Sequence, residues 1–123
     1  MITTVTLNPA VDKTIEIDDF NIGKVNRILT IRLDAGGKGI NVSKVIQRLQ
    51  GKSIAVGILG GSSGSFIKNY IDSIGIENDF IMTEGETRTN IKIVDKFNHT
   101  NTDINESGPM VSDENLDRVF INF

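Results

Sequence analysis

The stretch "LDAGGKGINVSKVIQRLQG", Leu33–Gly51, decides what kind of fold to expect. Its first half places glycines at positions 36, 37 and 39 around a lysine, where side chains would block a close approach to the backbone. Its second half carries apolar residues at the spacing i, i+3, i+4, i+7, namely Val42, Val45, Ile46 and Leu49. This spacing predicts an amphipathic helix, and Gly51 stands where a left-handed C-terminal cap is expected.

Apolar segments on both sides of this stretch predict strands. Ile2–Leu7 is rich in Val, Ile and Thr and is stopped by Asn8-Pro9. Ser53–Leu59 is a nearly continuous apolar run, as expected for a strand buried on both faces of a parallel sheet. A second helix pattern follows the turn "GGSSG" and stops at Gly75, with the apolar residues Phe66, Ile67, Tyr70, Ile71 and Ile74. This alternation predicts an α/β fold with a mainly parallel sheet.

Other segments alternate apolar and polar residues with a period of two. They are Thr14–Phe20, Val25–Leu33 and the region 87–105, in which a polar turn over 96–101 indicates a hairpin. Such strands are half-buried, with one apolar face and one polar face. An apolar sheet face needs a partner, and a second copy of the chain would serve.

The end of the sequence predicts a last helix. Ser112 is its expected N-cap, and Asp113 and Glu114 lie in its first turn. Its apolar face consists of Leu116, Val119, Phe120 and Phe123, and the pattern has no glycine stop. A helix ending on its own apolar face lacks a partner. We therefore expect the chain to represent only part of a longer protein.

The composition excludes several function classes. The 123 residues carry a formal charge of −3 without a basic stripe, so a nucleic-acid partner is not expected. The apolar runs are shorter than the roughly 20 residues that span a bilayer, and the N-terminus does not resemble a signal peptide, so we expect neither a membrane nor export. No cysteine is present, and His99 alone does not build a zinc centre. The simplest expectation is a cytoplasmic protein.

The glycine loop by itself leaves two interpretations open. Its glycines and the free N–H groups of the following helix suit an oxygen-rich or anionic ligand, but a plain strand-to-helix turn also needs glycines. A P-loop is excluded because Lys38 is followed by Gly39 instead of Ser or Thr. A dinucleotide-binding fingerprint that starts at Gly37 is also excluded, because it would require a glycine at position 42, which is occupied by Val42.

Three motifs together resemble a known family. "TLNPAVD", "AGGKGINVS" and "TRTNIKI" occur in the order found in the phosphofructokinase B branch of the ribokinase-like sugar kinases, above all 1-phosphofructokinases and tagatose-6-phosphate kinases. The resemblance covers nearly the whole chain. It implies a three-layer α/β sandwich with a small β-sheet lid over the sugar, and the lid often pairs two subunits. The alternating segments at about 13–33 and 87–105 match that lid.

The resemblance also implies sugar-binding residues. Asp12 would hold sugar hydroxyls, the backbone of Gly36 and Gly37 would approach the sugar, and Asn41 would contact a hydroxyl. The plain alternatives are a solvated turn aspartate just past the first strand and an ordinary first-turn helix residue.

Charged residues are implied at the phosphate groups. Lys38 would contact the transferred phosphoryl group, and the planar guanidinium of Arg88 suits the phosphate already on the sugar. Asn90 lies on the same strand face as Arg88, and Lys24 would add a cation, in one arrangement from the neighbouring subunit. For Lys38, Asn90 and Lys24 the alternative is an exposed polar side chain without a role.

The expected function follows from this resemblance. Residues 1–123 would form the N-terminal, sugar-binding portion of a kinase that phosphorylates fructose 1-phosphate with ATP and Mg²⁺, and the fragment alone would be inactive. The family's catalytic base, in a Gly-Ala-Gly-Asp motif, and its ATP pocket belong to a later half that these residues do not contain. A tagatose-6-phosphate kinase, and a non-catalytic module that binds sugar phosphate or dimerises, remain as alternatives.

Overall fold

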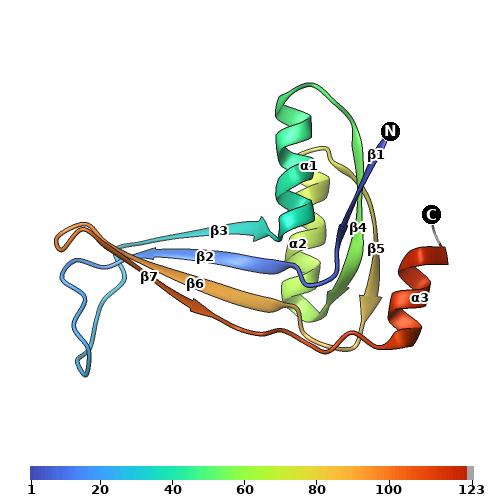
Figure 1. Ribbon diagram of the computed structural model, residues 1–123. Helices are drawn as coiled ribbons and strands as arrows, with labels where there is room; N and C mark the ends of the chain where they lie inside the picture. Colours follow the sequence, from blue (N-terminus) through green and yellow to red (C-terminus); the bar gives the residue numbers. More distant parts are fainter. Residues whose placement is uncertain (122–123) are drawn as a thin grey trace.

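The computed structural model describes residues 1–121 and contains two separate β-sheets. Strands β1, β4 and β5 form a three-stranded parallel sheet in the body, and β3, β2, β6 and β7 form a four-stranded mixed sheet. The second sheet projects from the body as an arm, which we call the lid (Figure 1). The elements are β1 Ile2–Thr6, β2 Ala10–Glu16, β3 Thr30–Gly36, α1 Lys38–Arg48, β4 Ser53–Gly60, α2 Gly61–Ser73, β5 Glu77–Thr83, β6 Arg88–Asp95, β7 Thr100–Asn105 and α3 Asp113–Ile121.

The body has three layers around its central strand β4. Helices α1 and α2 cover one face of the sheet and α3 covers the other (Figure 1). Ala55 and Leu59 of β4 lie in the cluster beneath α1 and α2, whereas Val56 and Ile58 pack with Val119 of α3. Because both faces of β4 are covered, both sets of alternating residues are apolar. The predicted α/β class and the buried parallel strand are confirmed.

Several element boundaries differ from the sequence prediction. Strand β2 begins directly after Pro9, so Asp12 lies inside a strand and not in a turn. Strand β3 is shifted toward the glycines, and residues 17–29 form the loop at the far end of the lid. Strand β5 was missed because Glu77, Asn78 and Asp79 open it, although Phe80 and Ile81 are buried. Helix α2 begins at Gly61, earlier than its apolar pattern suggests.

Helix α1 buries a different face from the one predicted. Val42, Val45 and Leu49 remain 49%, 48% and 77% exposed, whereas Ile40 and Ser43 are buried. The Ser43 hydroxyl hydrogen-bonds the hydroxyls of Thr4 on β1 and Ser53 on β4, at 2.7 and 2.8 Å. Since hydroxyl pairs attach this helix to the sheet, apolar periodicity alone identified the wrong contact face.

The cap of the last helix is confirmed. The Ser112 hydroxyl accepts a hydrogen bond from the Asn115 N–H at 3.1 Å, and Val119 is only 2% exposed. Phe120 is 53% exposed in spite of its place on the predicted apolar face, and Phe123 lies outside the described residues. Within residues 1–121, none of the helices is sufficiently long and apolar to cross a bilayer.

A buried carboxylate holds the far end of the lid together. Asp95, 2% exposed, accepts backbone N–H bonds from Asp19, Phe20 and Asn98 at 2.8–3.1 Å, and an Asn98 side-chain bond at 2.8 Å. These bonds join the end of β6 to the loop after β2. The Asn98 amide, followed by the backbone donors, lowers the pKa of Asp95 to about 2.

We expect Asp95→Asn to lower the thermal unfolding temperature of the full-length protein at pH 7. The folded pKa of Asp95 lies below its ordinary value of 3.8, so its stabilising contribution is present above pH 4 and is lost as the pH falls toward 2. The difference in melting temperature between wild type and variant, measured by circular dichroism, should therefore become smaller as the pH falls from 4 toward 2. Asp18→Asn, an exposed neighbour, is the control. Equal melting temperatures at pH 7 would contradict this role.

Candidate functional site

Polar side chains form two rows across the lid, close to where it joins the body. Strand register aligns Asp34, Asp12, Asn90 and Asn105 in the first row. It aligns Arg32, Thr14, Lys92 and Asp103 in the second row, two residues further along each strand. Residues two apart share a face of a sheet, so both rows lie on the same side. The period-two alternation predicted polar strand faces, but only the pairing of the strands reveals these rows.

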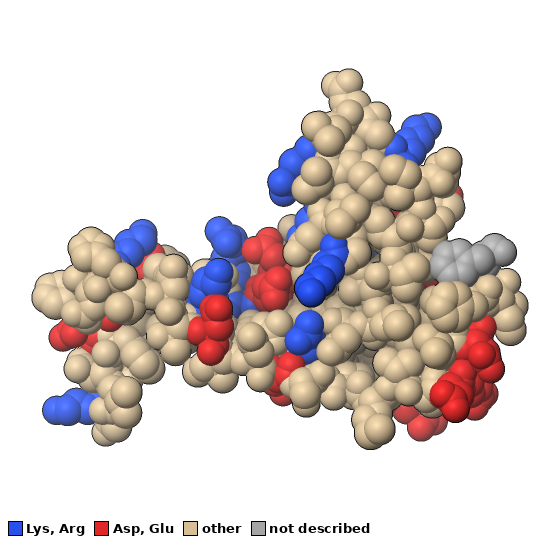
Figure 2. Space-filling view, in the orientation of Figure 1, with Lys and Arg blue, Asp and Glu red and all other residues tan. Residues whose placement is uncertain are grey.

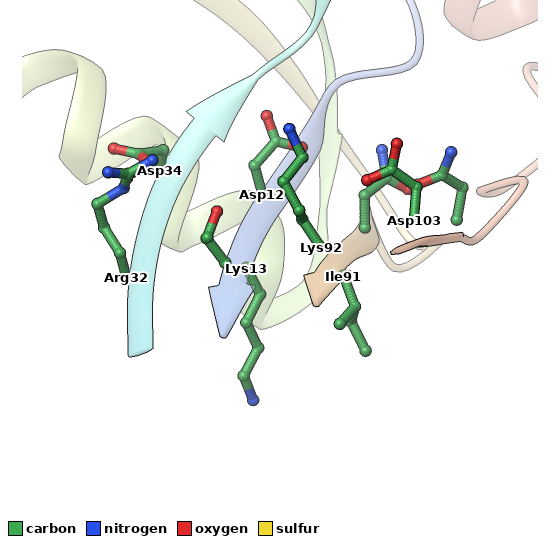
Figure 3. Close-up of a pocket in the computed structure, with 10 residues that line it drawn as sticks. Asp12, Lys13, Arg32, Asp34, Ile91, Lys92 and Asp103 are labelled. Atoms are coloured by element: carbon green, nitrogen blue, oxygen red, sulfur yellow. Dashed lines mark hydrogen bonds and ion pairs between the residues drawn. The ribbon is translucent and has the colours of Figure 1, made fainter. Parts of the chain in front are cut away.

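The two rows line a polar hollow of about 280 Å³. Figure 3 shows Asp12, Lys92 and Asp103 pointing to one side of the lid, whereas Lys13 and Ile91 point to the other. Basic and acidic side chains gather where the arm meets the body (Figure 2). Closely spaced donors and acceptors of both charges suit a ligand with many hydroxyls.

Asp12 is the central carboxylate of this hollow. It is half-buried, and its carboxylate lies directly over the backbone of Gly36, where an added Cβ would come within 1.9 Å of the Asp12 Oδ2 atom. Burial raises the pKa of Asp12, and the nearby cations Lys44, Arg88 and Lys92 oppose that rise. These cations therefore favour the ionised form of the Asp12 carboxylate.

Asn90 lies beside Asp12 and carries a free acceptor. Its Oδ1 atom is buried and lacks a hydrogen-bond partner among the described residues. A buried amide oxygen without a partner is costly, and a hydroxyl donor from a ligand would satisfy it.

Arg88 lies on the same lid face, one step closer to the body than Asn90. Its guanidinium donates to the carbonyl oxygens of Asn8 and Glu106, at 3.1 and 3.4 Å. Its Nε atom is buried without a partner in residues 1–121. Arg88 thus ties the turn after β1 to the end of β7 and keeps one N–H free, a structural task that the sequence did not indicate.

The start of α1 borders the lid. Gly37 is its N-cap, with φ 129°, and within the described chain no side chain caps this helix or places an acid in its first turn. Lys38 and Asn41 are exposed on that first turn. The four predicted residues of this segment lie next to one another, but none of them lines the hollow: Gly36, Gly37, Lys38 and Asn41. Within residues 1–121 the walls of the hollow come from lid strands alone.

The second glycine-rich helix start differs from the first. At the N-terminus of α2, the Glu86 carboxylate accepts hydrogen bonds from the Ser63 N–H at 2.9 Å and the Ser62 hydroxyl at 3.1 Å. These bonds, led by the Ser63 backbone, lower the pKa of Glu86. The chain's own carboxylate thus occupies the helix end that a ligand anion would use, whereas among residues 1–121 no side chain caps the start of α1.

Lys24 lies apart from the other candidates. It is exposed in the loop 17–29, at the end of the lid farthest from the body (Figure 1). Within one chain this position is remote from Asp12. A contact of Lys24 with sugar phosphate therefore requires a neighbouring subunit.

The described residues do not fit a metal site. Histidine and acidic side chains within residues 1–121 do not gather in a group of three that would hold a metal ion. Asp12 and Asp34 are neighbours, but Lys44 and Arg88 act on the former and Arg32 pairs with the latter at 2.9 Å. The Mg²⁺ and ATP implied by the resemblance therefore have no assigned ligands in this part of the chain.

A three-layer α/β body with a β-sheet lid and a polar hollow at the lid's root defines a small-molecule-binding unit of the kind found in carbohydrate kinases. The family model for the pfkB family carbohydrate kinases matches residues 5–121. The chain belongs to this family.

Named relatives are similar over nearly the whole chain. Curated 1-phosphofructokinases from Borreliella burgdorferi and Bacillus subtilis are 44% identical over 117 residues and 41% identical over 116 residues. These matches cover 95% and 94% of this chain, which therefore spans only 38% and 37% of the relatives' lengths. A solved Thermotoga maritima structure, described as a possible 1-phosphofructokinase, is 40% identical with a TM-score of 0.89, covering 99% of this chain and 40% of that one.

We expect Gly36→Ala to displace the Asp12 carboxylate, because the new methyl group occupies its position. The substitution should lower the free energy of unfolding of the full-length protein by about 1 kcal/mol, the lower end of the range for overpacking. Asp12→Ala removes the clashing atoms, so adding Gly36→Ala to Asp12→Ala should cost much less. Urea titrations of the two single variants and the double variant measure this coupling. Strict additivity would show that the two residues do not compete for this space.

Proposed function

We propose that the chain is the sugar-binding N-terminal part of a 1-phosphofructokinase, which transfers a phosphoryl group from ATP to fructose 1-phosphate to form fructose 1,6-bisphosphate. The observation that carries this proposal is the identity of 41–44% with curated 1-phosphofructokinases over 94–95% of the chain. The polar hollow at the root of the lid supports it, because its size and mixed donors and acceptors suit a sugar.

Each candidate residue has a role in this proposal. Asp12 accepts hydrogen bonds from sugar hydroxyls, and the unsatisfied amide oxygen of Asn90 accepts another. Gly36 leaves the space that the Asp12 carboxylate needs. Gly37 and Asn41 approach the sugar from the start of α1. These contacts orient the sugar against the lid before any phosphoryl transfer.

The cations serve the phosphate groups. Arg88 lies on the same lid face as the hollow, next to its wall and not in it, and its guanidinium binds the phosphate on the sugar. Lys38, exposed on the first turn of α1, offsets negative charge at the transferred phosphoryl group. Lys24 contributes from the partner lid of a dimer.

The remaining machinery belongs to the part of the kinase beyond this chain. ATP supplies the phosphoryl group, and the family's aspartate base, its Mg²⁺ and its nucleotide pocket belong to the C-terminal half. Residues 1–123 bind and orient the sugar phosphate, so the fragment alone is inactive.

The other face of the lid supports a homodimer. Leu29, Ile31, Leu33 and Ile104 are 42–56% exposed on the lid. Pairing with the lid of a second copy would remove this apolar surface from water. We propose such a dimer, in the cytoplasm, as the working form of the enzyme.

The test is the activity of the full-length protein on two sugars. We expect ATP-dependent phosphorylation of fructose 1-phosphate with a kcat/KM at least about tenfold above that for tagatose 6-phosphate, since their hydroxyls and phosphates meet the hollow differently. A coupled assay of ADP release measures both rates. A preference for tagatose 6-phosphate would replace the proposed substrate, and a stop codon directly after Phe123 would favour a non-catalytic binding module.

We expect Arg88→Ala mainly to raise the KM for sugar phosphate in the full-length enzyme. Loss of a charge-assisted contact costs about 1.5–3 kcal/mol, which corresponds to roughly tenfold or more in KM. Arg118→Ala on α3 is the matched arginine control. Because Arg88 also binds Asn8 and Glu106, melting temperatures must accompany the kinetics. An unchanged KM in a folded variant would remove Arg88 from the phosphate site.

A further inference from the structure

Lys44 connects helix α1 to the root of the lid. Its half-buried ammonium group donates a hydrogen bond to the carbonyl oxygen of Ala35, the residue before Gly36 on β3. The same group lies 5.1 Å from the centre of the Tyr70 ring on α2. This arrangement is a cation–π contact, which is strongest where water is excluded. Lys44 therefore contacts both the lid and the second helix.

Tyr70 makes a second connection to the same strand. Its hydroxyl donates to Asp34 Oδ1 at 3.1 Å, and the Arg32 Nε donates to Asp34 Oδ2 at 2.9 Å. Helices α1 and α2 thus hold two successive residues of β3, Asp34 and Ala35. We call Lys44, Tyr70, Asp34 and Ala35 the root clamp.

The root clamp adjoins the proposed sugar-binding residues. Asp34 is aligned with Asp12 in the pairing of β3 with β2, and Ala35 precedes the glycine beneath the Asp12 carboxylate. In the described residues, Lys44 is not part of the hollow's wall. Its effect on a bound sugar therefore passes through Asp12 and Gly36.

The charges around Asp12 also connect Lys44 to this carboxylate. Among the charges around Asp12, Lys44 opposes the effect of burial most strongly, ahead of Arg88 and Lys92 on β6, and Asp34 on β3 acts in the opposite direction. Burial lowers the pKa of Lys44. The carboxylates of Asp34 and Asp12 counteract this decrease, and the charge of Arg48 adds to it. Lys44 and the Asp12 carboxylate thus favour one another's charged forms, whereas Asp34 disfavours the charged form of Asp12.

We propose that Lys44 is a positioning residue of the sugar site, which holds the end of β3 in place and adds a positive charge that favours the carboxylate form of Asp12, the form that accepts hydrogen bonds from sugar hydroxyls. This inference rests on the proposed function of Asp12. It assigns a task to a residue that does not touch the sugar, and it explains why a lysine occupies a half-buried position between two helices.

The test compares Lys44→Met with Lys44→Arg in the full-length enzyme. Methionine keeps the apolar stem over Tyr70 but loses the charge and the donor, so the pKa of Asp12 should rise. We expect Lys44→Met to raise the KM for fructose 1-phosphate about threefold or more with a kcat close to that of wild type, and Lys44→Arg to change the KM less. Lys68→Met, which removes a partly exposed lysine of α2 that pairs with Asp72, is the control.

A second readout does not depend on activity. Carboxyl-carbon NMR of the substrate-free protein should show Asp12 titrating at higher pH in Lys44→Met than in wild type, and Tyr70→Phe should shift it less. An unshifted Asp12 titration, or a KM of Lys44→Met equal to that of wild type, would overturn the proposal. If wild type does not phosphorylate fructose 1-phosphate, the proposed function fails, while the Asp12 titration still decides the electrostatic role of Lys44.

Discussion

The packing of the glycine loop against the end of β1 and the start of β2 is the contact on which the rest of the structure depends. A Cβ at Gly37 would lie 2.6 Å from the Thr6 methyl group, and one at Gly39 would lie 2.6 Å from the Val5 carbonyl oxygen. At Gly36 the obstacle is the Asp12 carboxylate. The glycines are therefore required for the packing of the chain's own segments, before any ligand is considered. Only this close approach lets β3 lead into α1 while β2 runs beside it into the lid.

The two faces of the lid differ in their chemistry. Alternating side chains place a polar hollow on one face and apolar residues on the other, because successive residues of a strand point in opposite directions. The polar face near the root lies beside the glycine loop, where the helices reach β3 through the root clamp. At the end of the lid farthest from the body, the Asp95 carboxylate joins two loops by accepting hydrogen bonds from both. A small sheet is thus held at both ends, which suits a platform for binding a sugar.

Similar sequence patterns led to different local outcomes. Two glycine-rich turns precede helices, yet the Glu86 carboxylate binds the start of the second helix, whereas no side chain in the described part of the chain caps the first. The apolar stripe Val42, Val45 and Leu49 looked like a core face, but hydroxyl bonds of Ser43 attach α1 to the sheet instead. In both cases the deciding partner comes from a distant segment. Local periodicity contains no information about that partner, and this is also why Arg88's bonds to Asn8 and Glu106 were not foreseen.

The sequence by itself determined the α/β class, most strands and helices, the helix stop at Gly75, and the family, because hydrophobic period, glycine positions and short motifs are local properties. At the end of α1 the prediction was wrong, because the left-handed residue is Gln50, with φ 65°, and not Gly51. It also indicated Asp12, Gly36, Arg88 and Asn90 as residues to examine. Tertiary structure alone decided that Asp34, Asp103 and Asn105 join Asp12 and Asn90 around one hollow, and that Lys44 of α1 reaches the end of β3 beside them. The physical reason is register: a strand's side-chain pattern says which residues share a face, but only pairing with other strands says which of them become neighbours.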